Sequence, residues 1–439
     1  MNVSFKNESN KPTIIIVILI MIIGFGSCSE DNEQEEILIP IATLTNMNPI
    51  SGPKATVVTI NGTNFSDINT VQVFFNEVEA VVESVSVTQI KAKVPSGAGT
   101  GLIKVISNDV ALVGQEFTYI LTTAVTTIAG GSLAGITDGT GIDARFNNPR
   151  DITVDAQGNV YVAGGNGHRI RKITSNGIVT TLAGSIEGSN DGTDSNAQFN
   201  LPSGVALDIQ GNLYVADTQN RSVRKITPTG VVSTLAGGTL GLDDGTGTDA
   251  EFAFPTGITI DTQGDLYTVD GSRIRKITPT GVVTTIAGSG AGFEDGTTAT
   301  AKFNNPKGIA IDAQNNLYIA DTQNHRIRKI TPDGTVSTLA GSIQGFQDGS
   351  VTSATFNNPR GITIDSQNNL YIADSDNHKI RKITPNGIVS TIAGTTNGFA
   401  DGNANESNFS QPNSLAIDLD GSLYIADQKN HRVRKIVQD

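Results

Sequence analysis

A block of about 53 residues recurs six times in the second part of the chain. Prolines mark it at intervals of 53, 53, 51, 53 and 53 residues, and a tyrosine in each block keeps the same spacing. The one short interval follows Asp270, where Gly271-Ser272 replaces a longer loop. A repeat of this kind predicts units that bury their apolar faces only against one another. The marker prolines are Pro149, Pro202, Pro255, Pro306, Pro359 and Pro412.

Each repeat is expected to contain four short strands and no helix. In the fourth unit they cover 308–312, 317–321, 326–330 and 335–340, and Pro332-Asp333-Gly334 marks the last turn. Strands this apolar are typical of sheets that are covered on both faces, as in the blades of a propeller.

Two motifs are out of step with the repeat, and this offset predicts how a ring would close. Arg-Lys-Ile occurs six times, and the last copy at 434–436 ends three residues before the end of the sequence. The pattern Val-(Thr/Ser)-Thr-(Ile/Leu)-Ala-Gly also occurs six times, but its first copy at 125–130 precedes the first full unit. Pairing of this surplus strand with the last unit would close six blades and protect an open edge.

The repeated motifs resemble those of a known family. Pro-x-Gly-Ile-Ala-Ile-Asp, Asn-Leu-Tyr-Ile-Ala-Asp and Asn-His-Arg-Ile are similar to the NHL repeat, most closely in units four to six. The resemblance implies a six-bladed β-propeller over residues 121–439. NHL propellers include binding scaffolds and a few enzymes, so the resemblance specifies a fold more than a function.

Residues 41–120 predict a smaller all-β domain. Strands are expected at 56–60, 70–75, 81–87, 90–94 and 102–106, and Asn61-Gly62 predicts a tight turn. This pattern indicates a β-sandwich. The segments 48–53, 60–65 and 94–101 resemble an IPT/TIG domain, which implies an immunoglobulin-like fold that serves as a spacer.

The N-terminal residues indicate export and lipidation. The apolar run 14–23 covers only about half of a ~30 Å hydrocarbon core, as in a signal peptide. Small residues before Cys28 resemble a bacterial lipobox, so 1–27 is predicted to be removed and Cys28 acylated. An acidic tether, 28–40, follows, and Ser29-Glu30-Asp31 resembles an export signal of surface lipoproteins. We therefore expect a protein of the outer membrane that is exposed at the cell surface, with the periplasmic face as the alternative.

Composition limits the partners. The net charge of −13 disfavours phosphate backbones, so no nucleic-acid partner is expected. Membrane contact is expected only through the lipid on Cys28, and the chain is expected to be a monomer. Because Cys28 is the only cysteine, disulfides are excluded.

Candidate binding residues fall on one end of the predicted ring, where the loops between strands two and three emerge together with the long loops between blades. We call this end the loop face; in the fourth unit it is expected to carry the loop 321–325 and the long loop that contains Asp295-Gly296. The histidines occupy one repeat position and are interpreted as loop braces, with metal or base chemistry as the alternative. The aspartates end strand two, where pairing with an arginine such as Arg326 is expected. In the first unit Gly164-Gly165-Asn166-Gly167 replaces the acid, which would leave a notch beside the sixth blade. These candidates are Asn166, His168, Asp217, Asp321, His325, Asp374, His378, Asp427 and His431.

Aromatic residues and Asp-Gly turns give two further candidates on this face. Phe293, Phe346 and Phe399 lie near the loop tips and are the predicted stacking residues. The segments 138–143 and 244–249 have spacing that weakly resembles a calcium loop. Neither contains a full ligand set, so a turn is the preferred interpretation and no cofactor is predicted. The phenylalanines before the prolines, such as Phe303, are expected to plug the blades.

These observations favour a binding protein over an enzyme. The units look interchangeable at every polar position, whereas catalysis needs an acid, a base or metal ligands in different roles. No catalytic residue and no metal ligand is assigned. The leading hypothesis is a cell-surface scaffold whose loop face binds a polysaccharide or a protein. The alternatives are a metal-dependent hydrolase or lyase with a site in the propeller channel, and a structural adhesin.

Overall fold

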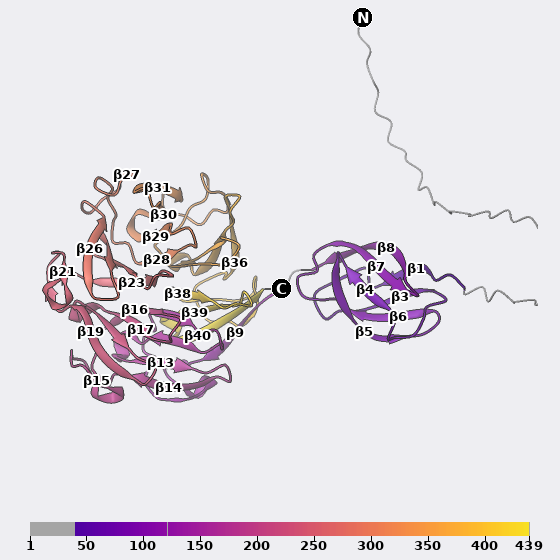
Figure 1. Cartoon of the computed structure of the whole chain (residues 1–439), viewed down its shortest axis with the longest axis horizontal. Helices are drawn as coiled ribbons and strands as arrows, with labels where there is room; N and C mark the ends of the chain where they lie inside the picture. Colours follow the sequence, from indigo (N-terminus) through magenta and orange to yellow (C-terminus); the bar gives the residue numbers. More distant parts are fainter. Residues whose placement is uncertain (1–39, 121, 439) are drawn as a thin grey trace, which may run out of the picture.

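The computed structural model describes residues 40–120 and 122–438, which form two all-β modules (Figure 1). The predicted signal peptide, Cys28 and nearly all of the tether lie outside the described residues. Within the described ranges, no helix is long and apolar enough to cross a bilayer.

The first module is a sandwich around one apolar core. Its strand order is β1-β3-β6-β5-β4-β7-β8-β2, and β5 pairs with both β6 and β4. Phe75 and Phe117 meet edge to face at its centre, with ring centroids 5.0 Å apart. The strands are β1 Thr43–Asn48, β2 Ser51–Gly52, β3 Val57–Thr63, β4 Gln72–Phe75, β5 Val78–Val85, β6 Gln89–Lys93, β7 Gly101–Ser107 and β8 Val110–Tyr119.

The tight turn predicted at Asn61-Gly62 is wrong. Both residues lie inside β3, where Asn61 is the register partner of Gln89. A Cβ on Gly62 would stand 1.9 Å from the carbonyl oxygen of Thr43. Glycine is therefore required here because two strands approach closely, and no turn is involved.

The second module is the predicted six-bladed propeller. Each blade is an antiparallel meander whose first strand lies nearest the axis, while the strands at the outer edge face solvent (Figure 1). The first strands are β11 Asp151–Val154, β16 Pro202–Leu207, β23 Pro255–Ile260, β28 Gly308–Ile311, β33 Pro359–Ile364 and β38 Pro412–Ile417. The second strands are β12 Val160–Ala163, β17 Leu213–Asp217, β24 Leu266–Asp270, β29 Leu317–Asp321, β34 Leu370–Asp374 and β39 Leu423–Asp427.

The third and fourth strands complete each blade. The third strands are β13 Ile170–Ile173, β18 Ser222–Ile226, β25 Arg273–Ile277, β30 Arg326–Ile330, β35 Lys379–Ile383 and β40 Arg432–Gln438. The fourth strands are β14 Ile178–Ala183, β19 Val231–Gly237, β26 Val282–Ala287, β31 Thr335–Ala340, β36 Ile388–Ala393 and, in the sixth blade, β9 Thr123–Ala129. For the fourth blade, three of the four predicted ranges match these bounds and the first is one residue too long.

Ring closure follows the predicted offset. β9 pairs antiparallel with β40, so that Val125 is opposite Ile436 and Ala129 is opposite Val433. The first strand of the propeller thus supplies the outer strand of the last blade, and the end of β40 at Gln438 lies opposite the start of β9 at Thr123 (Figure 1). No blade is left with an unpaired edge at the seam.

Short elements hold the long loops between the blades and the loops that follow strand two. After each Asp of the Asp-Gly loops, two residues form a fifth strand on the blade's outer edge, where the sequence predicted only a turn. These strands are β10 Gly139–Thr140, β15 Gly192–Thr193, β21 Gly245–Thr246, β27 Gly296–Thr297, β32 Gly349–Ser350 and β37 Gly402–Asn403. In the third blade β20 Thr239–Leu240 also pairs with β22 Glu251–Phe252. The 3-10 turns are η1 Gly141–Asp143, η2 Gly165–Gly167, η3 Asp194–Asn196, η4 Thr218–Asn220, η5 Gly247–Asp249, η6 Thr322–Asn324, η7 Ser375–Asn377 and η8 Gln428–Asn430.

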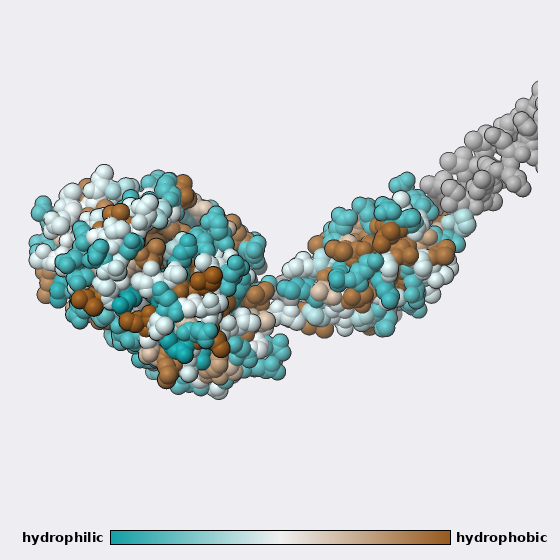
Figure 2. Space-filling view, turned by 90° about the horizontal axis from the view of Figure 1, so that it is seen from below, coloured by the Kyte–Doolittle hydropathy of each residue, from teal (hydrophilic) through white to brown (hydrophobic). Residues whose placement is uncertain are grey.

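Hydrophobic side chains on the surface are unevenly distributed between the modules. On the face shown in Figure 2 they are scattered over the propeller and gather on the sandwich. Val81, Val87 and Val113 of the sandwich are each about two-thirds exposed.

Candidate functional site

A fully buried arginine lies at the loop-face end of each blade. In the fourth blade the guanidinium of Arg328 donates to Asp321 at 2.8 Å and to Asp295 at 2.6 Å. It also donates to the carbonyl oxygens of Glu294 and Lys302, and it lies 5.0 Å from the ring centroid of Phe303. One arginine therefore fixes the end of strand two, the Asp-Gly loop and the plug phenylalanine together.

The strand-two aspartates are part of this lock. The predicted pairing with arginine is present, but the partner is Arg328 of strand three and not Arg326. Because these carboxylates are fully buried and paired, the structure does not make them available to a ligand. They are Asp217, Asp321, Asp374 and Asp427, each 0% exposed.

The four histidines connect neighbouring blades. The Nδ1 of His325 accepts a hydrogen bond from the backbone N–H of Asn358 at 3.1 Å, and His378 accepts one from Gln411 at 3.1 Å. His168 and His431 accept equivalent bonds at 3.3 Å. Desolvation lowers the pKa of His325, His378 and His431, which favours the neutral ring that can accept a proton. This geometry is that of the loop brace predicted from the repeat.

The first blade departs from this pattern, as its sequence predicted. Gly164 stands where the acid would be, and Asn166 in η2 is exposed. Arg171 consequently pairs only with Asp138, at 2.7 Å, and its buried Nε has no partner among the described residues. This blade therefore has one carboxylate fewer at its centre than the other five.

The three predicted stacking residues, which we call the rim phenylalanines, lie on the long loops. Phe293, Phe346 and Phe399 are 47%, 68% and 45% exposed. Arg326 lies 4.0 Å from the ring centroid of Phe293, and Arg432 lies 3.8 Å from that of Phe399. Two of the rings thus already contact a cation, and Phe346 offers the most free surface.

The possible calcium loops serve another purpose. Asp138 accepts hydrogen bonds from Arg171 and from the backbone and side chain of Thr181, and Asp244 has the same kinds of partner. In the part of the chain that the structure describes, no group of three His, Cys, Asp or Glu side chains could hold a metal ion.

A cavity of about 500 Å³ occupies the axis of the propeller. At its loop-face end lies a ring of six side chains, one from each blade, each directly after a repeat proline. We call this ring the channel mouth, and its members are Arg150, Ser203, Thr256, Lys307, Arg360 and Asn413. This ring was not predicted from the sequence. The signal for it was the residue after each marker proline, which differs between units. The expectation that the units are interchangeable at every polar position is therefore wrong.

Glycines allow the blades to approach one another at this mouth. A Cβ on Gly204, Gly257 or Gly308 would stand 2.0, 2.3 or 2.1 Å from a carbonyl oxygen of the next blade. In the first blade Asp151 takes the glycine position. Its carboxylate accepts hydrogen bonds from the backbone N–H of Val205 and from the hydroxyl of Ser414, and burial raises its pKa to about 6. Asp151 thus joins the first blade to its neighbours on both sides.

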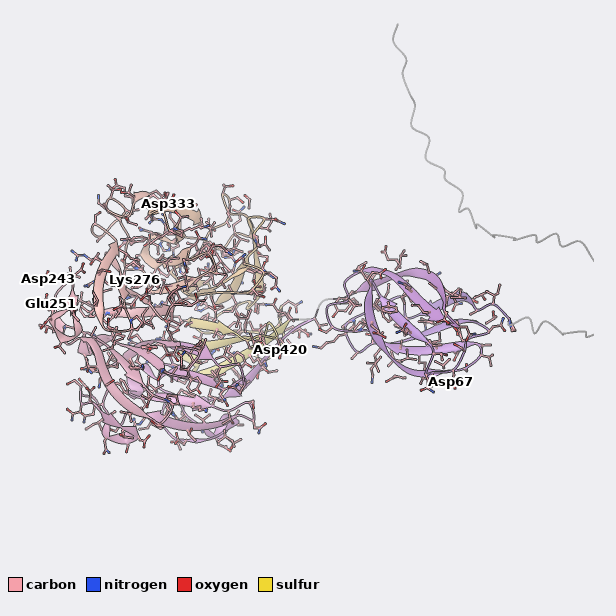
Figure 3. The ribbon with its side chains drawn as sticks, in the orientation of Figure 1. Asp67, Asp243, Glu251, Lys276, Asp333 and Asp420 are labelled. Atoms are coloured by element: carbon pink, nitrogen blue, oxygen red, sulfur yellow. The ribbon has the colours of Figure 1, made fainter. Side chains whose placement is uncertain are left out.

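Three cations converge on the channel mouth without an ion-pair partner among the described residues. Arg150 donates to the hydroxyl of Ser203 at 2.8 Å, and Arg360 donates to the side-chain oxygen of Asn413 at 3.0 Å. Lys307 makes no side-chain hydrogen bond within the described ranges, and burial together with both arginines lowers its pKa to about 8. Elsewhere charged side chains such as Asp243, Glu251 and Asp333 lie at the periphery of the ring (Figure 3). The axis is therefore positive in a protein that is acidic as a whole.

Comparisons with known families agree with both modules. The IPT/TIG domain model matches residues 42–121. The teneurin NHL domain model matches 135–191 and 238–295, and the NHL repeat model matches 303–330, 356–383 and 409–436. The chain therefore combines an IPT/TIG domain with a propeller of NHL repeats.

Relatives share the propeller or the whole architecture. NHL repeat-containing protein 2 of Gallus gallus is 32% identical over 339 residues, and the match covers 65% of this chain and 46% of that protein. The chain thus spans about half the length of this curated relative. A structural genomics protein from Bacteroides thetaiotaomicron has a TM-score of 0.64 at 22% identity, and an auxiliary nutrient binding protein from Bacteroides ovatus has 0.61 at 21%. Each of these two matches covers 91% of this chain and 98% of the other, which shows that the fold is shared.

Proposed function

We propose that this protein is a lipid-anchored binding protein of the bacterial cell surface, in which the sandwich is a spacer and the propeller binds a saccharide or a protein at its loop face. The apolar run and Cys28 support the anchor. The name of the Bacteroides ovatus neighbour, an auxiliary nutrient binding protein, supports binding as the role.

One observation carries this proposal. The loop-face aspartates, histidines and arginines that could have formed a reactive site are consumed in locking the loops, while the axial cavity keeps polar groups that differ from blade to blade. A preformed pocket of some hundreds of Å³ with a few convergent polar groups is typical of a ligand site. A rigid scaffold also lowers the entropy lost when a ligand binds.

Titration calorimetry of the chain lacking residues 1–28 against soluble oligosaccharides tests the binding role. We expect at least one oligosaccharide to bind, and Thr256→Trp, which places a large ring in the channel mouth, to weaken it at least tenfold. Substitution of Thr335, the first residue of β31 at the opposite end of the ring, by Ala is the matched control. Binding that only the opposite turns affect would contradict the assignment of the loop face.

Membrane fractionation tests the anchor independently. Cys28→Ser removes the only thiol that could be acylated, so the full chain should move from the membrane fraction to the soluble fraction. An unchanged membrane fraction would contradict lipidation at this position.

A further inference from the structure

The channel mouth has an excess of positive charge that no salt bridge among the described residues neutralises. Its charged lining consists of Arg150, Lys307, Arg360 and the single carboxylate of Asp151. Asp151 accepts hydrogen bonds from Val205 and Ser414 and forms no ion pair with another described residue. Three cations are thus held around one cavity with at most one opposing charge in its wall.

The cations also influence one another across the ring. The positive charges of Arg360 and Arg150 both lower the pKa of Lys307, and the charge of Arg360 also lowers the pKa of Arg150. The one acid that acts on this group is Asp376, which faces Arg360 and accepts hydrogen bonds from the amides of Asn358 and Gln411. Like charges held together and partly desolvated are unfavourable unless an anion joins them.

Unused donors point to such an anion. The Nε of Arg150 is buried and has no acceptor among the described residues. Lys307 is partly buried, and its ammonium makes no hydrogen bond or ion pair within the same ranges. A buried donor that lacks an acceptor is uncommon in a folded protein and often marks a site for a bound group.

The remaining lining suits a sugar. Ser203, Thr256, Asn413 and Gln428 present hydroxyl and amide groups that can pair with sugar hydroxyls.

We propose that the channel mouth binds an anionic sugar, whose carboxylate or sulfate is held by Arg150, Lys307 and Arg360. This inference rests on the proposed binding function and specifies its ligand class. The hydroxyls of the sugar face Ser203, Thr256 and Asn413, and the rest of an oligomer leaves through the mouth toward the loop face. The blades that carry the cations are the first, fourth and fifth, so the cations contact the ligand from opposite sides of the ring.

Titration calorimetry with the chain lacking residues 1–28 tests this site. The probes are digalacturonate, a sulfated galactose disaccharide, neutral digalactose and the acidic dipeptide Glu-Glu. We expect one anionic disaccharide to bind at least tenfold more tightly than digalactose and Glu-Glu, with an affinity that falls as salt is added. Comparison of the first two probes identifies the carboxylate or the sulfate as the bound group.

Variants locate the site and separate it from the proposed function. Lys307→Met, Arg150→Gln and Arg360→Gln should each weaken the anionic probe about tenfold or more, whereas Lys307→Arg should retain most of the affinity. Lys329→Met, on the third strand of the same blade as Lys307 and outside the channel, is the matched control. Melting temperatures confirm that each variant is folded. The inference would be overturned if digalactose or Glu-Glu bound as tightly as the anionic sugars, or if Lys307→Met left the affinity unchanged. It would also be overturned if neither anionic sugar bound at millimolar concentration. Neutral oligosaccharides that bind through the rim phenylalanines would overturn it while leaving the proposed function intact.

Discussion

Basic side chains are fully buried in the blade interiors and partly buried at the channel mouth, and the two regions differ in how the charge is paired. Inside the blades, Arg328 and its equivalents are at most 2% exposed, and each is ion-paired with one or two aspartates. At the channel mouth, Arg150, Lys307 and Arg360 have no ion pair among the described residues. The paired arrangement recurs in every blade, whereas the unpaired cations occupy three of six positions.

This difference separates a structural from a functional use of charge. A buried ion pair neutralises its own charge, and its repetition in each blade indicates that the fold needs it. An unpaired buried cation destabilises the free protein, and a ligand that neutralises it recovers that free energy. The contrast can therefore be tested by removing a cation from each region and comparing stability.

The largest effect is expected from a paired arginine. Arg328→Met should lower the free energy of unfolding by about 3 kcal/mol, because it leaves the fully buried carboxylate of Asp321 without its cation. Arg171→Met in the first blade should cost less, about 1 to 2 kcal/mol, because the remaining partner Asp138 is half exposed and can be hydrated. Urea unfolding followed by circular dichroism measures both changes in stability. Equal losses of stability would show that the strand-two aspartate does not contribute to the difference between the two blades.

The opposite sign is expected at the channel mouth. Lys307→Met removes a partly desolvated charge that lies near Arg150 and Arg360, so it should raise the free energy of unfolding of the unliganded protein by about 1 kcal/mol. In a propeller of this size that corresponds to an increase of roughly 1 to 2 °C in Tm. Lys329→Met should leave Tm nearly unchanged. A loss of stability in Lys307→Met would show that this lysine supports the fold.

The pH dependence of the same variant sharpens the test. The pKa of Lys307 is lowered to about 8 in the folded protein, against 10.5 for an ordinary lysine. Below pH 8 the residue is charged in both states and its burial is fully unfavourable. Between pH 8 and about 10.5 the folded protein releases the proton first, so the wild type gains stability relative to Lys307→Met. The difference in Tm between the two proteins should therefore shrink from pH 8 to pH 10, and a constant difference would contradict the lowered pKa.

Sequence reasoning recovered what repeats and missed what varies. The spacing of prolines and the offset of 125–130 were enough to predict six blades and their closure, because every unit must satisfy the same packing against its neighbours. The channel mouth depends on one residue per blade, and its meaning appears only when distant residues such as Arg150 and Arg360 are brought around one axis. The partner of Asp321 was mistaken for a similar reason. Arg326 is its register partner in the neighbouring strand, but the buried guanidinium that reaches the carboxylate belongs to Arg328.

The smallest effect is expected from the histidine braces, which lie at the loop face and use neutral nitrogen acceptors. Desolvation and nearby Arg326 lower the pKa of His325, and Asp376 opposes this. The unfolded chain therefore binds more protons than the folded protein as pH falls below about 6.5, and stability is lost there. His325→Asn removes one such group and the bond to Asn358. The substitution should lower the free energy of unfolding by on the order of 0.5 kcal/mol at pH 7.5. On acidification to pH 5.5, the further loss of stability should be a few tenths of a kcal/mol smaller in the variant than in the wild type. Comparison with the wild type cancels the opposing contribution of the buried aspartates.

Affinity for the anionic sugar should not change in His325→Asn, because His325 braces the rim and does not line the cavity. A loss of affinity without a loss of stability would place this histidine in the ligand site and erase the distinction between the braced rim and the charged channel mouth.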